Sequence, residues 1–412
     1  MRTAQGRTSQ REPSHASRLD DIVGIDLGTT NSYVAVLVAG EPHVILDSQG
    51  RKAIPSVVAA PEGGPLLVGH SARSFALASN ERWISGPKRL LGRRYDSEPM
   101  RSVARRFPVT LKRGHADAIL VHLGEGIFSP EQVSGFILYH LCEMAREYLD
   151  APVTSAVIAV PHTFSREQRD LVSNAAQAAG LTKSQLVDEP TAALLAHKCG
   201  PGGAAGTRAV FHLGGGTCDV SVVTVGSVAT EVVATVQDAF LGGVDFDAQI
   251  VQVLLAEASQ QDRRRLVADV VSRQRLFEAA ELAKIALSSA EHTTIDLPHL
   301  IDGDPPIHLR ALIDRAQLEQ ITAGLIDRAL TLCRTAMAQA RVDRDQIDSV
   351  ILDGGQTRMP KVRDAVTEIF GRTPVEGPEP EECVARGAVL AGVSEAGGED
   401  EELVLALDPH FR

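Results

Sequence analysis

The sequence predicts an α/β protein with two similar lobes that face each other across a cleft. A pattern of strand, Gly/Thr turn and strand at residues 23–45 returns at residues 210–233, where Gly214 matches Gly28. Between the two copies, apolar strands alternate with amphipathic helices, which is the typical order of an α/β fold. Because the repeat is far longer than a solenoid unit, it predicts two lobes around a ligand cleft.

The composition places the chain among ordinary globular proteins. Its 412 residues correspond to two or three domains at about 150 residues each. Hydrophobic residues make up 44% and charged residues 23%, so wholesale disorder and fibrous repeats are disfavoured. The formal net charge of −12 argues against nucleic acid and anionic membranes as partners.

The cysteines and the N-terminus bear on the cellular compartment. The five cysteines form an odd set without a CxxC pair, so we expect a reducing compartment and a cytoplasmic location. No apolar run approaches the roughly 20 residues of a membrane-spanning helix. Residues 1–20 are rich in arginine but lack both the apolar segment of a secretory signal and the periodicity of an amphipathic presequence. We therefore expect a disordered tail there.

Helix caps and buried strands define the elements between the two hairpins. Ser129 and Pro130 predict the start of a helix over residues 128–149, as its N-cap and first helical residue. A buried strand is predicted at residues 156–161. A second amphipathic helix follows over residues 165–180, where a serine supplies the cap and a glycine the stop.

The second half of the chain is mostly helical and ends in a buried strand and an acidic tail. Helices are predicted at residues 247–259, 263–290 and 315–340, and a strand at 349–355. The Gly-rich stretch at 201–206 marks the boundary between the lobes. The predicted division is lobe I at 21–206 plus 376–395, lobe II at 207–375 with a helix-rich subdomain at about 244–322, and a linker-like tail at 396–412.

The Gly/Thr turns suit phosphate binding. No GK[ST] follows a glycine run and no GxGxxG opens a helix, so P-loop and Rossmann enzymes fit poorly. Small residues in a turn let backbone N–H groups approach phosphate oxygens. Two similar hairpins and a third Gly-Gly turn at 351–360 therefore predict a polyphosphate site between the lobes.

Eight motifs in order resemble one family over nearly all of residues 22–412. The motifs are VGIDLGTTNS, PKRLLGRR, VPHTFSREQR, DEPTAALLA, LGGGT, FLGGVDFD, EAAELAKIALSS and ILDGGQTRMP. The family that they resemble is that of the seventy-kilodalton heat-shock chaperones of the DnaK type, in their nucleotide-binding domain. The resemblance implies an actin-like fold of two lobes, each a mixed sheet flanked by helices, with MgATP in the cleft and K⁺ as a further candidate cation.

The resemblance implies catalytic roles for four residues. Lys88 would place its ammonium at the γ-phosphate and the attacking water, and Glu189 would orient that water. Thr217 would lie near the γ-phosphate. Asp26 would hold water around Mg²⁺, a hard cation that keeps its waters. The neighbouring arginines of PKRLLGRR are expected to be solvated surface residues.

Further positions would bind the nucleotide or relay its state. Pro161 and Arg169 match an interlobe switch pair of the family. The implied nucleotide-binding residues, which combine the phosphate turns with the adenosine side, are Gly28, Thr29, Thr30, Gly214, Gly215, Gly216, Gly242, Gly243, Glu281, Lys284, Ser288, Gly354, Gly355 and Arg358.

Two departures from the family set the expectations for function. His212 stands where the family has an aspartate, so a metal-side carboxylate is missing and hydrolysis is expected to be slow. His212 is left open as a metal-side residue, because it could point away from the cleft or Asp219 could substitute for the lost carboxylate. The sequence also stops about where the family's interdomain linker lies, so no peptide-binding domain is expected.

Three functions compete at this point. The leading prediction is an ATP-binding and ATP-hydrolysing chaperone motor domain. The alternative is a nucleotide-gated scaffold with little hydrolysis, favoured by His212. A sugar or acid kinase on the same fold is disfavoured by the chaperone-type motifs. J-domain and nucleotide-exchange co-chaperones are the implied partners, and unfolded client proteins would require a substrate domain beyond this chain.

Overall fold

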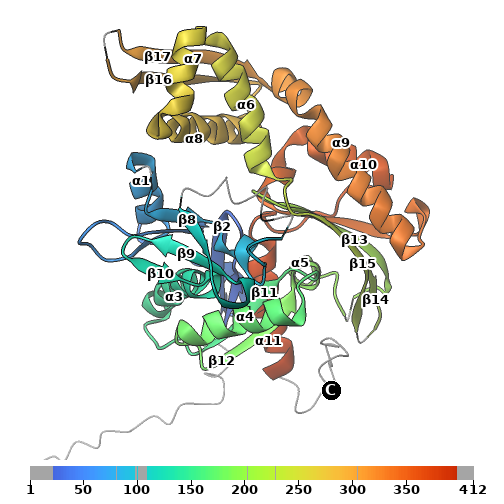
Figure 1. Ribbon diagram of the computed structural model, residues 1–412. Helices are drawn as coiled ribbons and strands as arrows, with labels where there is room; N and C mark the ends of the chain where they lie inside the picture. The colour runs from blue at the N-terminus through green and yellow to red at the C-terminus, as the bar shows by residue number, and fades with distance from the viewer. Residues whose placement is uncertain are drawn as a thin grey trace, which may run out of the picture.

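The computed structural model describes residues 22–396, except for positions 80, 98–99, 101–108, 202, 228 and 304. The predicted tail at 1–20 and, except for position 396 at the end of a helix, the predicted linker-like tail at 396–412 lie outside the described residues. Two lobes enclose a cleft, with lobe I in the lower half of Figure 1 and lobe II above it and to the right.

Lobe I is built on a mixed sheet with the order β12-β11-β1-β2-β3, and β4 pairs with β2. Strands β12, β11 and β1 run parallel, whereas β2 and β3 are antiparallel. The strands are β1 (Ile22–Asp26), β2 (Asn31–Val38), β3 (Glu41–Val44), β4 (Ile54–Pro55), β11 (Ser155–Val160) and β12 (Lys183–Asp188).

Helices cover both faces of this sheet. Alternate residues of β11 point to opposite faces. Ile158 therefore packs in the cluster that includes helices α3 (Pro130–Leu149) and α4 (Arg166–Ala178). Ala159 packs in a second cluster, with α5 (Glu189–Ala196) and α11 (Cys383–Ala396). The sheet is buried on both sides, as expected for parallel strands.

Local capping explains where α3 and α4 begin. Ser129 accepts a hydrogen bond from the backbone N–H of Gln132, and the Gln132 side chain accepts one from the Ser129 backbone. Ser165 and Gln168 make the same capping box at α4. Each box satisfies two helix-end donors, so both predicted N-caps are confirmed.

Smaller elements extend lobe I beside α3. One three-stranded sheet has the order β10-β9-β8 and another has the order β6-β5-β7. These elements are β5 (Val57–Ala59), β6 (Leu67–Val68), α1 (His70–Ala78), β7 (Trp83–Ser85), the 3₁₀ helix η2 (Pro87–Leu90), β8 (Thr110–Arg113), the 3₁₀ helix η4 (His115–Asp117), β9 (Ile119–Leu123) and β10 (Gly126–Phe128).

Lobe II repeats the arrangement of lobe I. Its sheet has the order β15-β14-β13-β18, where β13 pairs in parallel with β18 and antiparallel with β14, as β1 does with β11 and β2. The predicted fold class, two lobes that each contain a mixed sheet flanked by helices, is confirmed. The elements are β13 (Gly206–Leu213), β14 (Cys218–Val225), β15 (Thr230–Asp238), α9 (Arg315–Ala340), the 3₁₀ helix η5 (Arg344–Gln346), β18 (Ser349–Asp353), the 3₁₀ helix η6 (Gly355–Arg358) and α10 (Pro360–Phe370).

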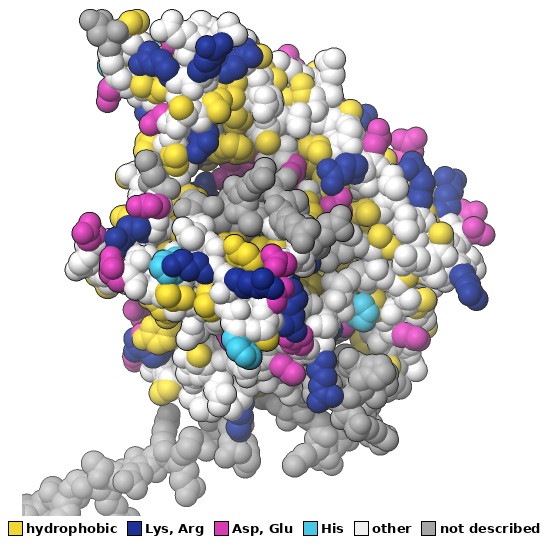
Figure 2. All heavy atoms as spheres, viewed as in Figure 1, with side chains coloured by type: hydrophobic (Ala, Val, Ile, Leu, Met, Phe, Trp, Pro, Cys, Tyr) yellow, Lys and Arg dark blue, Asp and Glu magenta, His cyan; other side chains and the backbone are white. Residues whose placement is uncertain are grey.

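A subdomain at the top of Figure 1 joins lobe II through α6. Figure 2 shows Lys and Arg side chains gathered over this end of the molecule. Besides its helices it contains a two-stranded antiparallel sheet. It comprises α6 (Gly243–Glu257), α7 (Gln260–Ala268), α8 (Val270–Ala286), β16 (His292–Ile301) and β17 (Ile307–Asp314).

Two predicted helix boundaries in this subdomain are wrong. The single helix expected over residues 263–290 is divided between α7 and α8, because Asp269 is extended and caps α8 by accepting from the Ser272 N–H at 2.7 Å. Helix α6 begins at Gly243, earlier than expected, because the Asp245 side chain accepts from the Gly242 N–H at 3.0 Å. A side-chain carboxylate near a helix start satisfies a backbone donor, and here it decides each boundary.

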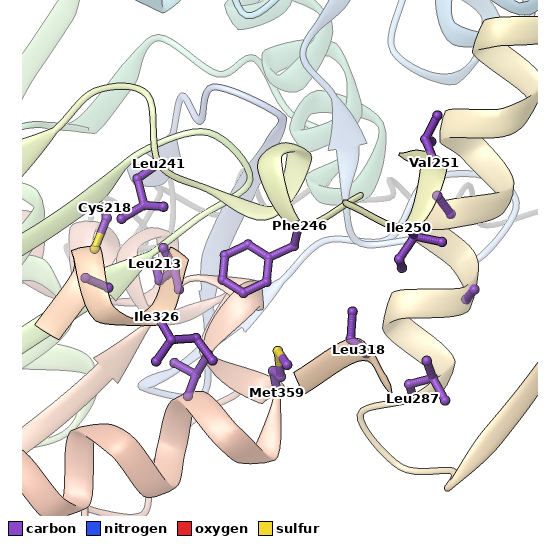
Figure 3. Packing of buried hydrophobic residues seen from close by; sticks show 14 of the residues in the cluster. Leu213, Cys218, Leu241, Phe246, Ile250, Val251, Leu287, Leu318, Ile326 and Met359 are labelled. Atoms are coloured by element: carbon purple, nitrogen blue, oxygen red, sulfur yellow. The ribbon is translucent and has the colours of Figure 1, made fainter. Parts of the chain in front are cut away.

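The largest core cluster lies in lobe II and compensates for the scarcity of aromatics. Phe246 is fully buried, and Figure 3 shows it among aliphatic side chains that include Leu213, Ile326 and Met359. These residues come from the sheet, from α9 and from the turn before α10. Removing a buried ring of this size typically costs about 3–5 kcal/mol, so Phe246 fastens α6 to the sheet.

Candidate functional site

A cleft of about 980 Å³ lies between the lobes and is lined by turns from both. All the site residues predicted from the sequence line it except Gly242. Gly242 lies behind the wall, where a Cβ would be 2.3 Å from the backbone nitrogen of Gly216. The structure thus brings together residues from eight separate motifs, and their individual roles stay predictions.

The two glycine turns of the repeat approach each other inside this cleft. A Cβ at Gly215 would lie 2.2 Å from the Thr30 hydroxyl oxygen. Only glycine leaves room for such a close approach. A ligand between the lobes therefore meets a turn from each copy of the duplication.

Lys88 and Glu189 form a buried ion pair at the cleft. The Lys88 Nζ is 2.6 Å from the Glu189 Oε1, and their side chains are 8% and 13% exposed. Burial lowers the pKa of Lys88, but the charges of Glu189 and Asp26 outweigh burial and raise it above its usual value. Helix η2 supplies the lysine, and the first residue of α5, directly after β12, supplies the glutamate. The ammonium therefore stays charged where phosphate would lie.

Two further buried carboxyl groups, those of Asp26 and Asp219, have raised pKa values. Burial, aided by Glu189, raises the pKa of Asp26 to about 7, against the opposing charge of Lys88. Burial raises the pKa of Asp219 to about 7 in the same way, although His212 lowers it. Burial disfavours the charged form of a carboxyl group, and the nearby acids add to that effect. A cation at this place would favour the charged carboxylates.

The acid cluster fits a hydrated divalent cation better than a directly ligated one. Among the described residues, no group of three or more His, Cys, Asp and Glu side chains is arranged to hold a metal ion directly. Mg²⁺ keeps several waters and takes few carboxylates when a phosphate also binds it. Asp26, a buried carboxyl group that lines the cleft, fits the role of holding such water.

His212 lies at the end of β13 and lines the cleft. Its Nδ1 lies 2.6 Å from the Asp353 Oδ2 and donates a hydrogen bond to it. Burial lowers the pKa of His212, but the charge and hydrogen bond of Asp353 raise it to about 10, with help from Asp219. The sequence analysis missed Asp353. Its signal was an acid at the end of the strand before a Gly-Gly turn, the position that Asp26 has in the first hairpin.

The expected adenosine side is held by ion pairs. Lys284 Nζ is 2.9 Å from the Asp247 Oδ1 and also donates to the Gly243 carbonyl at 2.9 Å. Glu281 of α8 pairs with Arg73 of α1, across the opening between the lobes. These contacts fix the α8 face that the sequence assigned to the nucleotide.

Arg358, also expected on the adenosine side, pairs with acids from the segment before α11. Its Nη2 is 2.7 Å from the Glu381 Oε1, and it contacts Glu379 as well. The guanidinium lines the cleft but is already paired. A base entering here would therefore meet an arginine held by two carboxylates.

The prediction that the arginines after Lys88 are solvated surface residues is partly wrong. Arg89 and Arg93 line the cleft, and the Arg89 Nη2 donates to the Gly216 carbonyl at 2.8 Å. The expectation of surface residues is wrong for these two, because Arg89 in η2 reaches the lobe II turn and Arg93 is half-buried at the wall of the cleft. It holds for Arg94, whose side chain is 54% exposed.

The predicted switch pair lies next to Glu189. Pro161 follows β11 and lines the cleft. Arg169 Nη2 is 2.5 Å from the Asp188 Oδ1, and His162 Nδ1 is 2.6 Å from the Asp188 Oδ2. Because Asp188 directly precedes Glu189, these bonds link helix α4 to the carboxylate in the cleft.

The protein falls into the class of actin-like nucleotide-binding proteins. It has two lobes of repeated topology, glycine turns that face each other and a buried lysine–carboxylate pair. The family model described as "Hsp70 protein" matches residues 22–409. The mitochondrial heat shock 70 kDa protein of Solanum tuberosum is 40% identical over 394 residues. That match covers 95% of this chain and 58% of the relative, so the chain spans less than two thirds of the relative's length. The chain belongs to the Hsp70 family.

The relative also corrects one expectation. Its name places it in the mitochondrion, which contradicts the cytoplasmic location predicted from cysteine usage. All five cysteines are free, but the matrix and the cytosol are both reducing, so this observation cannot distinguish them. Within the part of the chain that the structure describes, no helix is long and apolar enough to cross a membrane.

Proposed function

We propose that the chain binds MgATP between its lobes and hydrolyses it to ADP and phosphate, as the motor domain of an Hsp70-type chaperone. The observation that supports this best is the buried Lys88–Glu189 pair beside Asp26, where the turns of the two lobes meet. Family membership supports the same activity. Nothing in the site or the family assignment favours the scaffold alternative.

Catalysis would depend on positioning and charge. Lys88 holds the terminal phosphate and stabilises the charge that develops on it. Glu189 accepts a hydrogen bond from the attacking water and aligns it for in-line attack. Thr217 lies beside the same phosphate in the lobe II turn. Asp26 orients the waters of Mg²⁺, which when bound neutralises phosphate charge, and K⁺ would add to that neutralisation.

The partners follow from the family. J-domain and nucleotide-exchange co-chaperones would act on this motor domain. Unfolded client proteins would be bound only if a substrate domain exists beyond this chain. The Asp188 bonds to Arg169 and His162 support a relay of nucleotide state from Glu189 to the surface of lobe I.

Calorimetry and phosphate release test the proposal together. ATP and ADP should bind, binding should weaken in EDTA, and GTP should bind more weakly. Phosphate release should not depend on small phosphoryl acceptors, which separates an ATPase from a kinase. Equal affinity with and without Mg²⁺, or for ATP and GTP, would contradict the assigned site.

A further inference from the structure

Three polar side chains form a row across the end of the lobe II sheet. In the antiparallel pairing His212 lies opposite Asp219 of β14, and in the parallel pairing it lies beside Asp353 of β18. Neighbouring positions in paired strands place their side chains on the same face. The imidazole is therefore flanked by a carboxylate on each side.

A hydrogen bond at one nitrogen fixes the ring, and the other nitrogen faces a turn of the cleft. Nδ1 donates to the Asp353 Oδ2 at 2.6 Å, and the Asp353 side chain is only 3% exposed. Nε2 is directed toward the phosphate turn, since a Cβ at Gly214 would lie 2.8 Å from it. The His212 side chain is 22% exposed and lines the cleft. Only one ring nitrogen is left to meet a ligand.

We infer that His212 and Asp353 act as one unit, in which Asp353 positions the imidazole and the Nε2 of His212 contacts the terminal phosphate of the bound nucleotide. This inference rests on the proposed ATP site. The acid that the first hairpin carries on its central strand is thus replaced in the second hairpin by a histidine with its acid on the neighbouring strand.

The chemistry of the pair supports a donor to phosphate. A carboxylate that accepts from one ring nitrogen fixes the tautomer and orientation of the imidazole. Asp353 and Asp219 also raise the pKa of His212 to about 10, against the effect of burial. Nε2 then carries a proton, and hydrogen bonds between charged groups are stronger than neutral ones.

Interdependence of the two residues gives the test. Asp353→Asn keeps the shape of the side chain but removes the charge that holds the ring. His212→Asp places a second carboxylate against Asp353, and like charges in contact disfavour each other. His212→Asp/Asp353→Asn removes that conflict. Asp345→Asn, at a side chain that is 92% exposed, is the matched control.

The first readout is the imidazole of the nucleotide-free protein. NMR should show a far-downfield Nδ1 proton on His212, which Asp353→Asn shifts upfield because a neutral amide oxygen accepts a weaker hydrogen bond, and which Asp345→Asn leaves unchanged. The second readout is affinity for a non-hydrolysable ATP analogue compared with ADP. Asp353→Asn should weaken the analogue about tenfold, which corresponds to the loss of one charge-assisted hydrogen bond, and change ADP affinity less than twofold.

The double variant should bind the analogue more tightly than His212→Asp alone. If the effects of the two single substitutions on analogue affinity simply add in the double variant, His212 and Asp353 do not act as one unit. If Asp353→Asn weakens the analogue and ADP equally, Asp353 has only a structural role. If the wild type binds neither nucleotide, the proposed function and the phosphate contact both fail. If it binds both and Asp353→Asn behaves as wild type, only the present inference fails.

Discussion

The turn after β1 and the turn after β13 occupy equivalent places in the two lobes but carry different chemistry. In lobe I, Asp26 ends the central strand and lies beside Ala159 of β11. In lobe II, His212 ends the central strand and lies beside Asp353 of β18. Both lobes therefore have a carboxylate at this end of the sheet, but on different strands. In lobe I it is on the central strand, and in lobe II it is on the neighbouring strand.

Because of this difference, the two sides of the cleft present different charged groups. Burial raises the pKa of Asp26 to about 7, and a cation on the lobe I side would favour its charged form, which suits a hydrated metal ion. Asp353 and Asp219 keep His212 charged, so the lobe II side offers a donor that suits phosphate. The comparison shows that a carboxylate absent from one strand of a motif can be supplied by the neighbouring strand.

The largest expected effect lies on the lobe I side. Lys88→Ala should lower single-turnover hydrolysis about 10²–10³-fold, because the ammonium acts on the transition state. ADP affinity should change little. Lys112→Ala, at an exposed lysine on β8, is the control. Rapid-quench kinetics measure the rate, and a wild-type rate for Lys88→Ala would mean that the Glu189 pair is structural.

The next effect is on stability and depends on pH. The pKa of Asp26 is about 7 in the folded protein and 3.8 ordinarily. The folded state therefore binds more protons between these values, so the contribution of Asp26 to stability falls as pH rises from about 4 to 7. Asp26→Asn should remove this loss and raise the free energy of unfolding of the nucleotide-free protein by about 4 kcal/mol at pH 8.

Urea unfolding at pH 4.5 and pH 8 measures this difference, with Lys88, Glu189, His212 and Asp353 all in place. The variant and the wild type should converge at the lower pH. Asp26→Asn should also weaken the Mg²⁺ dependence of nucleotide binding. A constant stability difference across the range would show that Asp26 is ionised throughout.

A smaller effect should follow where the two turns meet. Gly215→Ala would force its Cβ against the Thr30 hydroxyl, and such overpacking typically costs about 1–3 kcal/mol. We expect weaker nucleotide binding by calorimetry, with part of it restored in Gly215→Ala/Thr30→Ala. Gly324→Ala, in open space on α9, serves as the control. An unaffected Gly215→Ala would mean that the lobes separate freely here.

The smallest effect concerns the bridge from η2 to the lobe II turn. Arg89→Ala removes the hydrogen bond to the Gly216 carbonyl, which should cost about 1 kcal/mol of nucleotide affinity. Arg94→Ala, at an exposed arginine, should be neutral. Equal affinities for the two variants, measured by competition with a fluorescent nucleotide, would remove Arg89 from the site.

Features encoded over a few residues could be predicted from the sequence. The N-caps at Ser129 and Ser165 and the two glycine turns depend on residues nearby in the sequence, and they lie where predicted. The break between α7 and α8 was not predicted, because the helical pattern continues on both sides of Asp269 and only the structure shows that this residue caps α8.

The sequence by itself determined the duplicated α/β architecture, the glycine turns, the Lys88 and Glu189 motifs and, through their order, the family. Only the tertiary structure decided that His212 has an acidic partner, Asp353, 141 residues away, and that Arg89 reaches Gly216, 127 residues away. Such contacts depend on strand register and on how the lobes pack, and both are set by the burial of whole faces. Phe246 is an example, because its burial in the lobe II core positions α6. No local pattern at His212 encodes which residue the adjacent strand places beside it.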